Sequence, residues 1–151
     1  METAMGKQYK QLATLGMPWE KAYGYAQAVR VGNTIYVAGQ LSHDEEGNFV
    51  APASLDGPGG VTDPSKMELQ MRTTYANAAK VLKHFGATLQ HVVEEVLYVT
   101  DMDAAFAVAG DVRKAAYGSD GPRCASTIAQ VERLAFRQQL IEIRLTAVLP
   151  E

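Results

Sequence analysis

The sequence has little cysteine, no long apolar run and no excess of basic charge. Its 151 residues include one cysteine, Cys124, which excludes an internal disulfide and is typical of a reducing compartment. No apolar run approaches the roughly 20 residues that a membrane span needs, and the first residues lack the basic and apolar regions of a secretion signal. We therefore expect a cytoplasmic protein without a membrane partner.

Basic residues are too few and too scattered to predict a nucleic-acid-binding surface. The chain has 14 Lys and Arg against 17 Asp and Glu, which gives a net charge of −3. It also lacks the phosphate-binding glycine patterns and the Gly-x-Ser-x-Gly nucleophile pattern. Its three histidines, His43, His84 and His91, do not have the spacing of zinc or iron ligands. The residues thus predict no nucleic-acid partner, no metal and no organic cofactor.

What is present is the composition of an ordinary globular domain. Apolar residues make up 47% and charged residues 21% of the chain, which is long enough to bury one hydrophobic core. We predict a single domain over residues 1–151, with an N-terminal extension at 1–20. A long loop is predicted at 43–64, because this segment is rich in Gly, Pro, Asp and Ser.

Strands are expected on both sides of this loop. A short strand is predicted near 9–15, within the extension. The runs 25–31 and 34–40 flank a Gly32-Asn33 turn and predict a β-hairpin. Beyond the loop, alternating or continuous apolar residues predict three further strands. These cover residues 92–100, 126–131 and 139–148.

Two helices are expected from residues that recur at three- and four-residue steps. The first begins near Ser65, which with Glu68 resembles a capping box, and ends at Gly86. The second runs from about Asp103 to Tyr117. The apolar residues expected to face the core are Met67, Met71, Tyr75, Ala78, Leu82 and Phe85 in the first helix and Phe106, Ala109, Val112 and Ala116 in the second.

This order of elements predicts a two-layer α+β domain in which both helices cover one face of the sheet. The other face must then be covered by something else. Oligomerisation is the usual way to cover such a face, so an oligomer is expected.

One carboxylate in the last predicted strand is a candidate for function. Ile141 and Ile143 belong to its apolar face. Glu142 lies between them in the sequence and belongs to the opposite face, which carries both apolar and charged residues. A carboxylate in an apolar strand is costly to bury unless it is paired or used. It could form an ion pair with Arg144, two residues on and on the same side, which spacing alone favours. Alternatively, it could line a cleft and hold a water molecule or a proton.

Four segments in order carry a resemblance to a known family. They are the hairpin Tyr25-Ala-Gln-Ala-Val-Arg-Val-Gly-Asn-Thr-Ile-Tyr-Val-Ala-Gly-Gln40, the helix 70–86, the strand that ends in Val-Thr-Asp-Met102, and the closing Arg133-Leu134…Ile141-Glu-Ile143. Together they resemble the reactive intermediate deaminase family (Rid, or YjgF) from about residue 20 onward. The resemblance implies a chorismate-mutase-like fold, a homotrimer with clefts between subunits, and no metal or organic cofactor. The best-known members hydrolyse amino-acid-derived enamines and imines to ammonia and a 2-oxo acid.

The resemblance also implies roles for individual residues. Tyr25 matches the tyrosine that lines the family's cleft, Gly39 matches the small residue of the cleft wall, and Glu142 matches the glutamate that holds the attacking water. The family's carboxylate-binding arginine does not carry over, because Ser126 stands at its position. An asparagine of the second helix is also missing, with Gly110 near its register. The chain therefore resembles a divergent branch.

Ser126, the backbone N–H groups near Cys124, and Arg123 are the candidates for the place of the missing arginine. The functional hypothesis is hydrolytic deamination of a small enamine or imine, with water positioned by Glu142. The resemblance makes 2-aminomuconate one plausible substrate, because some family members act on this compound. The alternative is a trimeric protein that binds a metabolite without turnover. Old family labels also raise ribonuclease activity, which the net negative charge disfavours.

Overall fold

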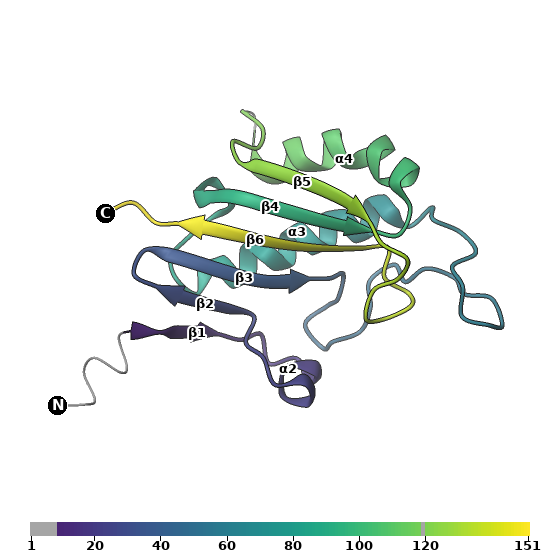
Figure 1. The fold of residues 1–151 in the computed structure, drawn as a ribbon, viewed down its shortest axis with the longest axis horizontal. Coiled ribbons are helices and arrows are strands. Elements are labelled where there is room, and N and C mark those ends of the chain that lie inside the picture. The colour runs from purple at the N-terminus through teal and green to yellow at the C-terminus, as the bar shows by residue number, and fades with distance from the viewer. Residues whose placement is uncertain (1–8, 119) are drawn as a thin grey trace.

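A six-stranded mixed sheet organises the chain (Figure 1). The computed structural model describes residues 9–118 and 120–151. Its strands lie in the order β1-β2-β3-β6-β4-β5. Neighbours are antiparallel except β4 and β5, which run parallel and are joined through a helix. The strands are β1 (Gln11–Ala13), β2 (Ala28–Val31), β3 (Thr34–Gln40), β4 (Val92–Val99), β5 (Ala125–Gln130) and β6 (Ile141–Val148).

The helices are α2 (Pro18–Tyr23), α3 (Met67–Lys83) and α4 (Met102–Tyr117), with a short 3-10 turn, η1, at Leu89–His91. Both α3 and α4 lie behind the sheet in Figure 1, on the same face. This arrangement confirms the predicted two-layer α+β fold, a mixed sheet with two helices on one face. None of the helices in the described part of the chain is long and apolar enough to cross a membrane.

The core lies between the sheet and the two long helices. In β6, Ile141, Ile143 and Leu145 alternate with more exposed neighbours and are almost completely buried against α3. The opposite sheet face has no covering element among the described residues. Tyr36 and Val148 lie on that face and are 54% and 40% exposed. Exposed apolar side chains on a sheet face can mark an interaction surface, and the expectation that an oligomer covers this mixed face stays a prediction.

The start of α3 differs from the prediction. Lys66 is the N-cap and has no side-chain capping bond, so the predicted capping box is wrong. Ser65 instead donates its backbone N–H and its hydroxyl to the Asp63 carboxylate, each at 2.9 Å. The helix ends at Lys83, and Gly86 takes a left-handed φ of 70° in the turn that follows.

In α4, Phe106 was predicted to be buried but is 66% exposed. Ala105 is buried in its place, and the predicted burial of Ala109 and Val112 is confirmed. Phe106 lies about 100° around the helix from Ala105, and this rotation turns its ring toward solvent.

The N-terminal segment contains more structure than predicted. Only residues 11–13 of the predicted strand pair with β2, and the six-residue helix α2 follows. Gly24 ends α2 with φ of 74°, so β2 begins at Ala28 rather than at Tyr25. The predicted long loop at 43–64 contains two isolated β-bridges, His43–Phe49 and Leu55–Val61, and is otherwise irregular.

Candidate active site

A cavity of about 210 Å³ lies where α2, the end of β3 and the start of β6 meet. Three of the predicted site residues, Tyr25, Gly39 and Glu142, line this cavity together. They come from segments far apart in the sequence, and the pairing of β3 with β6 brings two of them together. The other lining residues are Trp19, Tyr23, Ala38, Leu41, Ala135, Phe136 and Gln139.

Glu142 is the carboxylate of this cavity. It lies on the face of β6 that the helices leave open, because its neighbours Ile141 and Ile143 face the core. Burial raises the pKa of the Glu142 carboxyl above its usual range, and a hydrogen bond with the Gln139 side chain acts in the opposite direction. A carboxyl with a raised pKa in a cavity is a candidate general base.

The predicted ion pair between Glu142 and Arg144 is not formed. The ion pairs found among the described residues are Arg72–Glu68, Arg113–Glu95 and Arg123–Asp120. Arg144 is exposed on the same face of β6 as Glu142. Since no cation among the described residues pairs with it, the Glu142 carboxylate is available to a ligand or a water molecule.

Gly39 makes room for this carboxylate. A Cβ atom at position 39 would lie 2.5 Å from Cδ and 2.8 Å from Oε2 of Glu142, well inside van der Waals contact. The register of β3 against β6 also shifts between Val37 and Gln40, so the β3 backbone is irregular at this point. The absence of a side chain at Gly39 therefore allows Glu142 to lie directly against β3.

Tyr25 lies in the connection between α2 and β2 and is 37% exposed. Burial raises the pKa of its hydroxyl, and the charges of Glu20 and Glu142 raise it further. The hydroxyl thus stays protonated at neutral pH, and it can donate a hydrogen bond to a group in the cavity.

A buried polar network connects the elements that carry the cavity residues. No pattern in the sequence indicated this network. Oε2 of Glu20 accepts hydrogen bonds from the backbone N–H groups of Leu15 (3.0 Å) and Met17 (3.2 Å) and from the Gln27 side chain (2.9 Å). Gln27 in turn accepts a hydrogen bond of 2.8 Å from Gln40. Burial opposes ionisation of Glu20, but these hydrogen bonds hold its pKa below the usual value. The network connects α2 with Gln27, just before β2, and with Gln40 at the end of β3.

Comparison with known proteins identifies the family. The family model described as Endoribonuclease L-PSP matches residues 19–149. The chain belongs to this family. The same family includes the proteins called YjgF, RutC and Rid, so the resemblance seen in the sequence is confirmed.

Relatives in the Endoribonuclease L-PSP family span most of the chain. A RutC family protein of Pyrococcus abyssi is 30% identical over 123 residues, which are 82% of this chain and 84% of the relative. A mouse protein named 2-iminobutanoate/2-iminopropanoate deaminase is 30% identical over 110 residues, 72% of each chain. The crystal structure of Rv2704 from Mycobacterium tuberculosis, a YjgF/YER057c/UK114 family member, has a TM-score of 0.73 at 26% identity and covers 93% of this chain and 99% of that one.

The three candidates for the place of the family arginine lie away from this cavity within one subunit. Arg123 is exposed, and its guanidinium lies 3.5 Å from Asp120. The Ser126 hydroxyl donates a hydrogen bond of 2.7 Å to Glu95. Cys124 is half-buried beside Tyr117, and burial raises the pKa of its thiol, with the charge of Glu95 adding to this effect. A raised thiol pKa disfavours the thiolate form that nucleophilic chemistry needs.

Ser126, itself exposed, belongs to a second polar cluster centred on the fully buried Glu95. No pattern in the sequence indicated this cluster. Oε1 of Glu95 accepts hydrogen bonds from the hydroxyls of Tyr75 (2.8 Å) and Tyr117 (2.6 Å). Oε2 accepts from Ser126 and lies 2.8 Å from Nη2 of Arg113. Both carboxylate oxygens therefore have two partners each.

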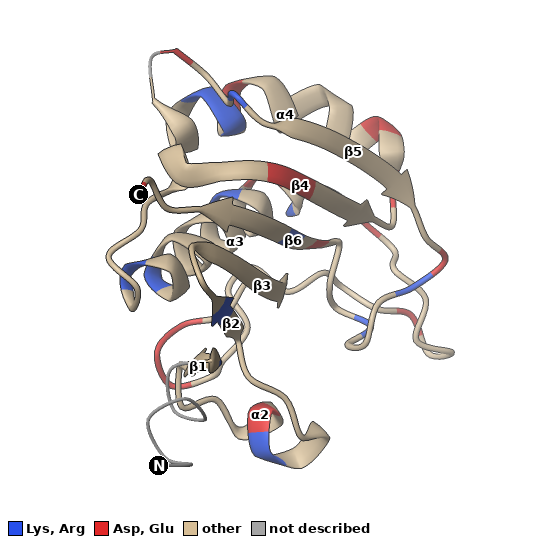
Figure 2. Cartoon of the chain, turned by 60° about the vertical axis from the view of Figure 1, so that its left-hand side comes forward, with Lys and Arg blue, Asp and Glu red and all other residues tan. Residues whose placement is uncertain are grey.

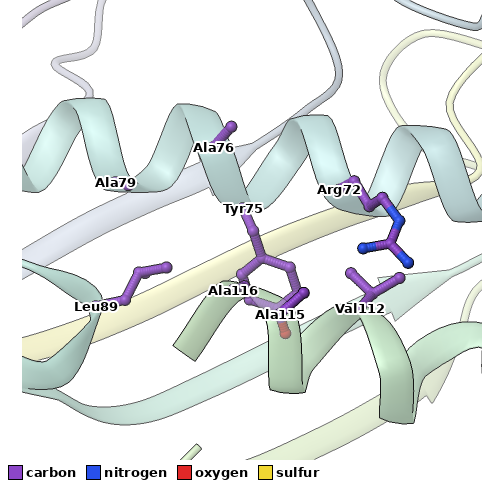
Figure 3. A pocket seen from close by; sticks show the side chains of 8 residues that line it. All are labelled: Arg72, Tyr75, Ala76, Ala79, Leu89, Val112, Ala115 and Ala116. Carbon is purple, nitrogen blue, oxygen red and sulfur yellow. The ribbon is translucent and has the colours of Figure 1, made fainter. Parts of the chain in front are cut away.

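This cluster connects four elements of the fold. Burial raises the pKa of the Tyr75 and Tyr117 hydroxyls, as does the neighbouring Glu95 carboxylate, so both remain donors. Figure 3 shows Tyr75 extending from α3 toward α4. It lines a pocket of about 260 Å³ in which four of the eight lining residues are alanines. We interpret the Glu95 cluster as structural, because no acceptor site on its carboxylate is left for a ligand.

Proposed function

We propose that this chain is a cofactor-independent deaminase that hydrolyses a small enamine or imine in the cavity of Tyr25, Gly39 and Glu142. The observation that carries the proposal is a carboxylate with a raised pKa, unpaired with any cation of the described residues, that lines an aromatic cavity. The mouse relative named as an iminobutanoate and iminopropanoate deaminase supports the same class of reaction. The proposed mechanism needs proton transfers only among the substrate, groups of this cavity and water.

In the proposed mechanism, an enamine first takes up a proton at carbon and becomes an iminium ion. The oxygen of a water molecule then bonds to the C=N carbon while Glu142 accepts a proton from that water, which gives a carbinolamine. Glu142 returns the proton to nitrogen and the C–N bond breaks. Glu142 then accepts the hydroxyl proton, which gives the carbonyl product, and passes this proton to ammonia, which leaves as ammonium. The protonated Tyr25 hydroxyl orients the substrate by hydrogen bonding.

We further propose that the chain works as a homotrimer with the cavity at the border between subunits. The open face of the sheet supports this assembly, since Leu12, Tyr36 and Val148 expose apolar surface there. Glu142 lies on the same face, so a neighbouring subunit packed on it would close the cavity and restrict the access of water.

The family description names endoribonuclease activity, but the charge of this chain disfavours that function. Neutralising RNA phosphates requires clustered Lys and Arg, and the net charge here is −3. Figure 2 shows the basic residues on several separate elements rather than along one surface. A trimer that binds a metabolite without turnover remains the alternative, which the same aromatic cavity would also serve.

A direct assay separates these functions. An imine is generated in situ from an amine or an amino acid by a flavin oxidase, and ammonia release is followed with and without the protein. Acceleration above the spontaneous rate is the result expected of a deaminase. Ligand binding with no acceleration would identify the metabolite-binding alternative, and cleavage of RNA by the same preparation would identify the ribonuclease.

A further inference from the structure

Aromatic side chains form a large part of the cavity that Glu142 lines. Trp19, Tyr23, Tyr25 and Phe136 line the cavity with it, and the rings of Trp19 and Phe136 pack edge to face with centroids 5.8 Å apart. Among the described residues, no lysine or arginine lines this cavity. In the described part of the chain, its wall therefore holds four aromatic side chains and one carboxylate, but no positive charge.

Such a wall favours cations and disfavours anions. The faces of aromatic rings carry partial negative charge and attract cationic groups. A substrate carboxylate bound here would lie beside Glu142 without a counter-charge from the described residues of this wall, and like charges repel strongly in a partly desolvated site. A protonated imine would instead find both the rings and an opposite charge. The same arrangement would thus bind the reacting group and place it against the base.

We infer that this cavity selects the iminium cation itself, and that its substrates are imines and enamines without a carboxylate rather than 2-imino acids. This inference rests on the proposed function and adds the substrate class. The overall reaction is R₂C=NH₂⁺ + H₂O → R₂C=O + NH₄⁺, so the positive charge enters as iminium and leaves as ammonium. No oxidant, reductant or further reactant is needed.

Three stable probes that share a phenyl ring test the inference by calorimetric titration of the full chain. Benzylammonium carries the cation alone, phenylglycine adds a carboxylate to it, and benzoate carries only the anion. We expect benzylammonium to bind at least tenfold more tightly than phenylglycine, and benzoate to show no measurable binding. Tighter binding of phenylglycine or benzoate would overturn the inference, as would no binding of benzylammonium at millimolar concentration.

Variants show whether charge recognition is responsible. Glu142→Gln should weaken benzylammonium binding at least tenfold and leave the binding of neutral benzyl alcohol unchanged. Tyr23→Ala removes a ring that is 68% exposed, so folding is little affected, and should weaken benzylammonium binding about three- to tenfold. Phe106→Ala on α4 removes an exposed ring outside the cavity and is the matched control, with no change expected. Equal loss for benzylammonium and benzyl alcohol in Glu142→Gln would overturn the inference.

Turnover distinguishes this inference from the proposed function. Selective binding of benzylammonium without hydrolysis of the corresponding imine would support cation selection by the cavity and contradict deaminase activity. Hydrolysis of the imine derived from phenylglycine as fast as that derived from benzylamine would support deaminase activity and overturn the inference.

Discussion

Gly39 and Glu142 form a pair in which the missing side chain of one residue makes room for the carboxylate of the other. A Cβ atom at position 39 would lie only 2.5 Å from Cδ of Glu142, so Gly39 cannot be replaced by alanine without displacing the carboxylate. In the proposed mechanism, catalysis depends on the position of the base to within about 1 Å. The close approach of Gly39 to Glu142 therefore affects catalysis as well as packing.

We therefore predict that Gly39→Ala lowers kcat/KM by about 10- to 100-fold with only a small change in melting temperature, since the displaced carboxylate can turn toward solvent. Gly110→Ala is the matched control. A Cβ at Gly110 meets no atom within 4 Å, so this change should keep activity and slightly raise stability. Unchanged turnover in Gly39→Ala would show that the close approach has no catalytic role.

The raised pKa of Glu142 predicts a pH dependence. Glu142 acts as a base only when ionised, so kcat/KM should fall as the pH drops through its folded-state pKa, which lies above the ordinary 4.5. Stability changes in the other direction. A carboxyl whose folded pKa is raised contributes most to stability below its unfolded pKa, and the contribution is lost as the pH rises through the folded value. An acid limb of kcat/KM centred at or below pH 4.5 would contradict this assignment.

At the scale of elements, periodicity in the sequence predicted the long helices and most strands. α3 and α4 span four or more turns, so their apolar spacing is well defined, and β6 has clear alternation around Glu142. The helix α2 was missed because six residues are too few to show a period. Phe106 was misplaced because the apolar stripe of a helix is broad, and sequence spacing alone does not fix which side of the stripe is buried.

The cavity residues Tyr25, Gly39 and Glu142 could be predicted from the sequence, but the two polar networks could not. Alternation along β6 placed Glu142 on the open face, and the family resemblance added Tyr25 and Gly39, which share its cavity. The networks of Glu20 and Glu95 depend on side chains that meet across elements 7 to 31 residues apart in the chain. No local pattern marks such contacts, so a single sequence taken alone contains no signal for them.

The Glu95 cluster connects β4, β5, α3 and α4, and we predict that it contributes strongly to stability. Glu95→Gln leaves the Arg113 guanidinium without its counter-charge and should lower the free energy of unfolding by about 3–5 kcal/mol. Replacing both residues, in Glu95→Gln with Arg113→Met, should recover part of this loss, because no unpaired charge remains. Denaturant unfolding of the single and double variants measures the coupling.

Glu68→Gln provides the control, since it breaks the exposed Arg72–Glu68 pair and should change stability by no more than about 0.5 kcal/mol. Additive effects of the changes at Glu95 and Arg113 would mean that the two side chains do not act as a pair.

At the scale of the whole molecule, the open sheet face predicts assembly. Light scattering should give about three times the chain mass of 16.4 kDa. Tyr36→Glu places a charge on this face in every subunit, at a position that is exposed in a single chain, and should yield a folded monomer with little turnover. Phe106→Glu places the same charge on α4, away from the open face, and should leave the mass unchanged. A wild-type chain that is a stable monomer at micromolar concentration would exclude the trimer and its shared cavity.

The most direct test of catalysis by Glu142 is the rate of ammonia release by Glu142→Gln, measured beside the wild type on the same imine. Glutamine keeps the size of the side chain but cannot accept the proton of the attacking water. We predict a trimer with an unchanged melting temperature or a slightly higher one, and turnover lowered by about 10²- to 10⁴-fold. Turnover equal to that of the wild type, with a lowered melting temperature, would make the carboxylate structural and contradict the mechanism.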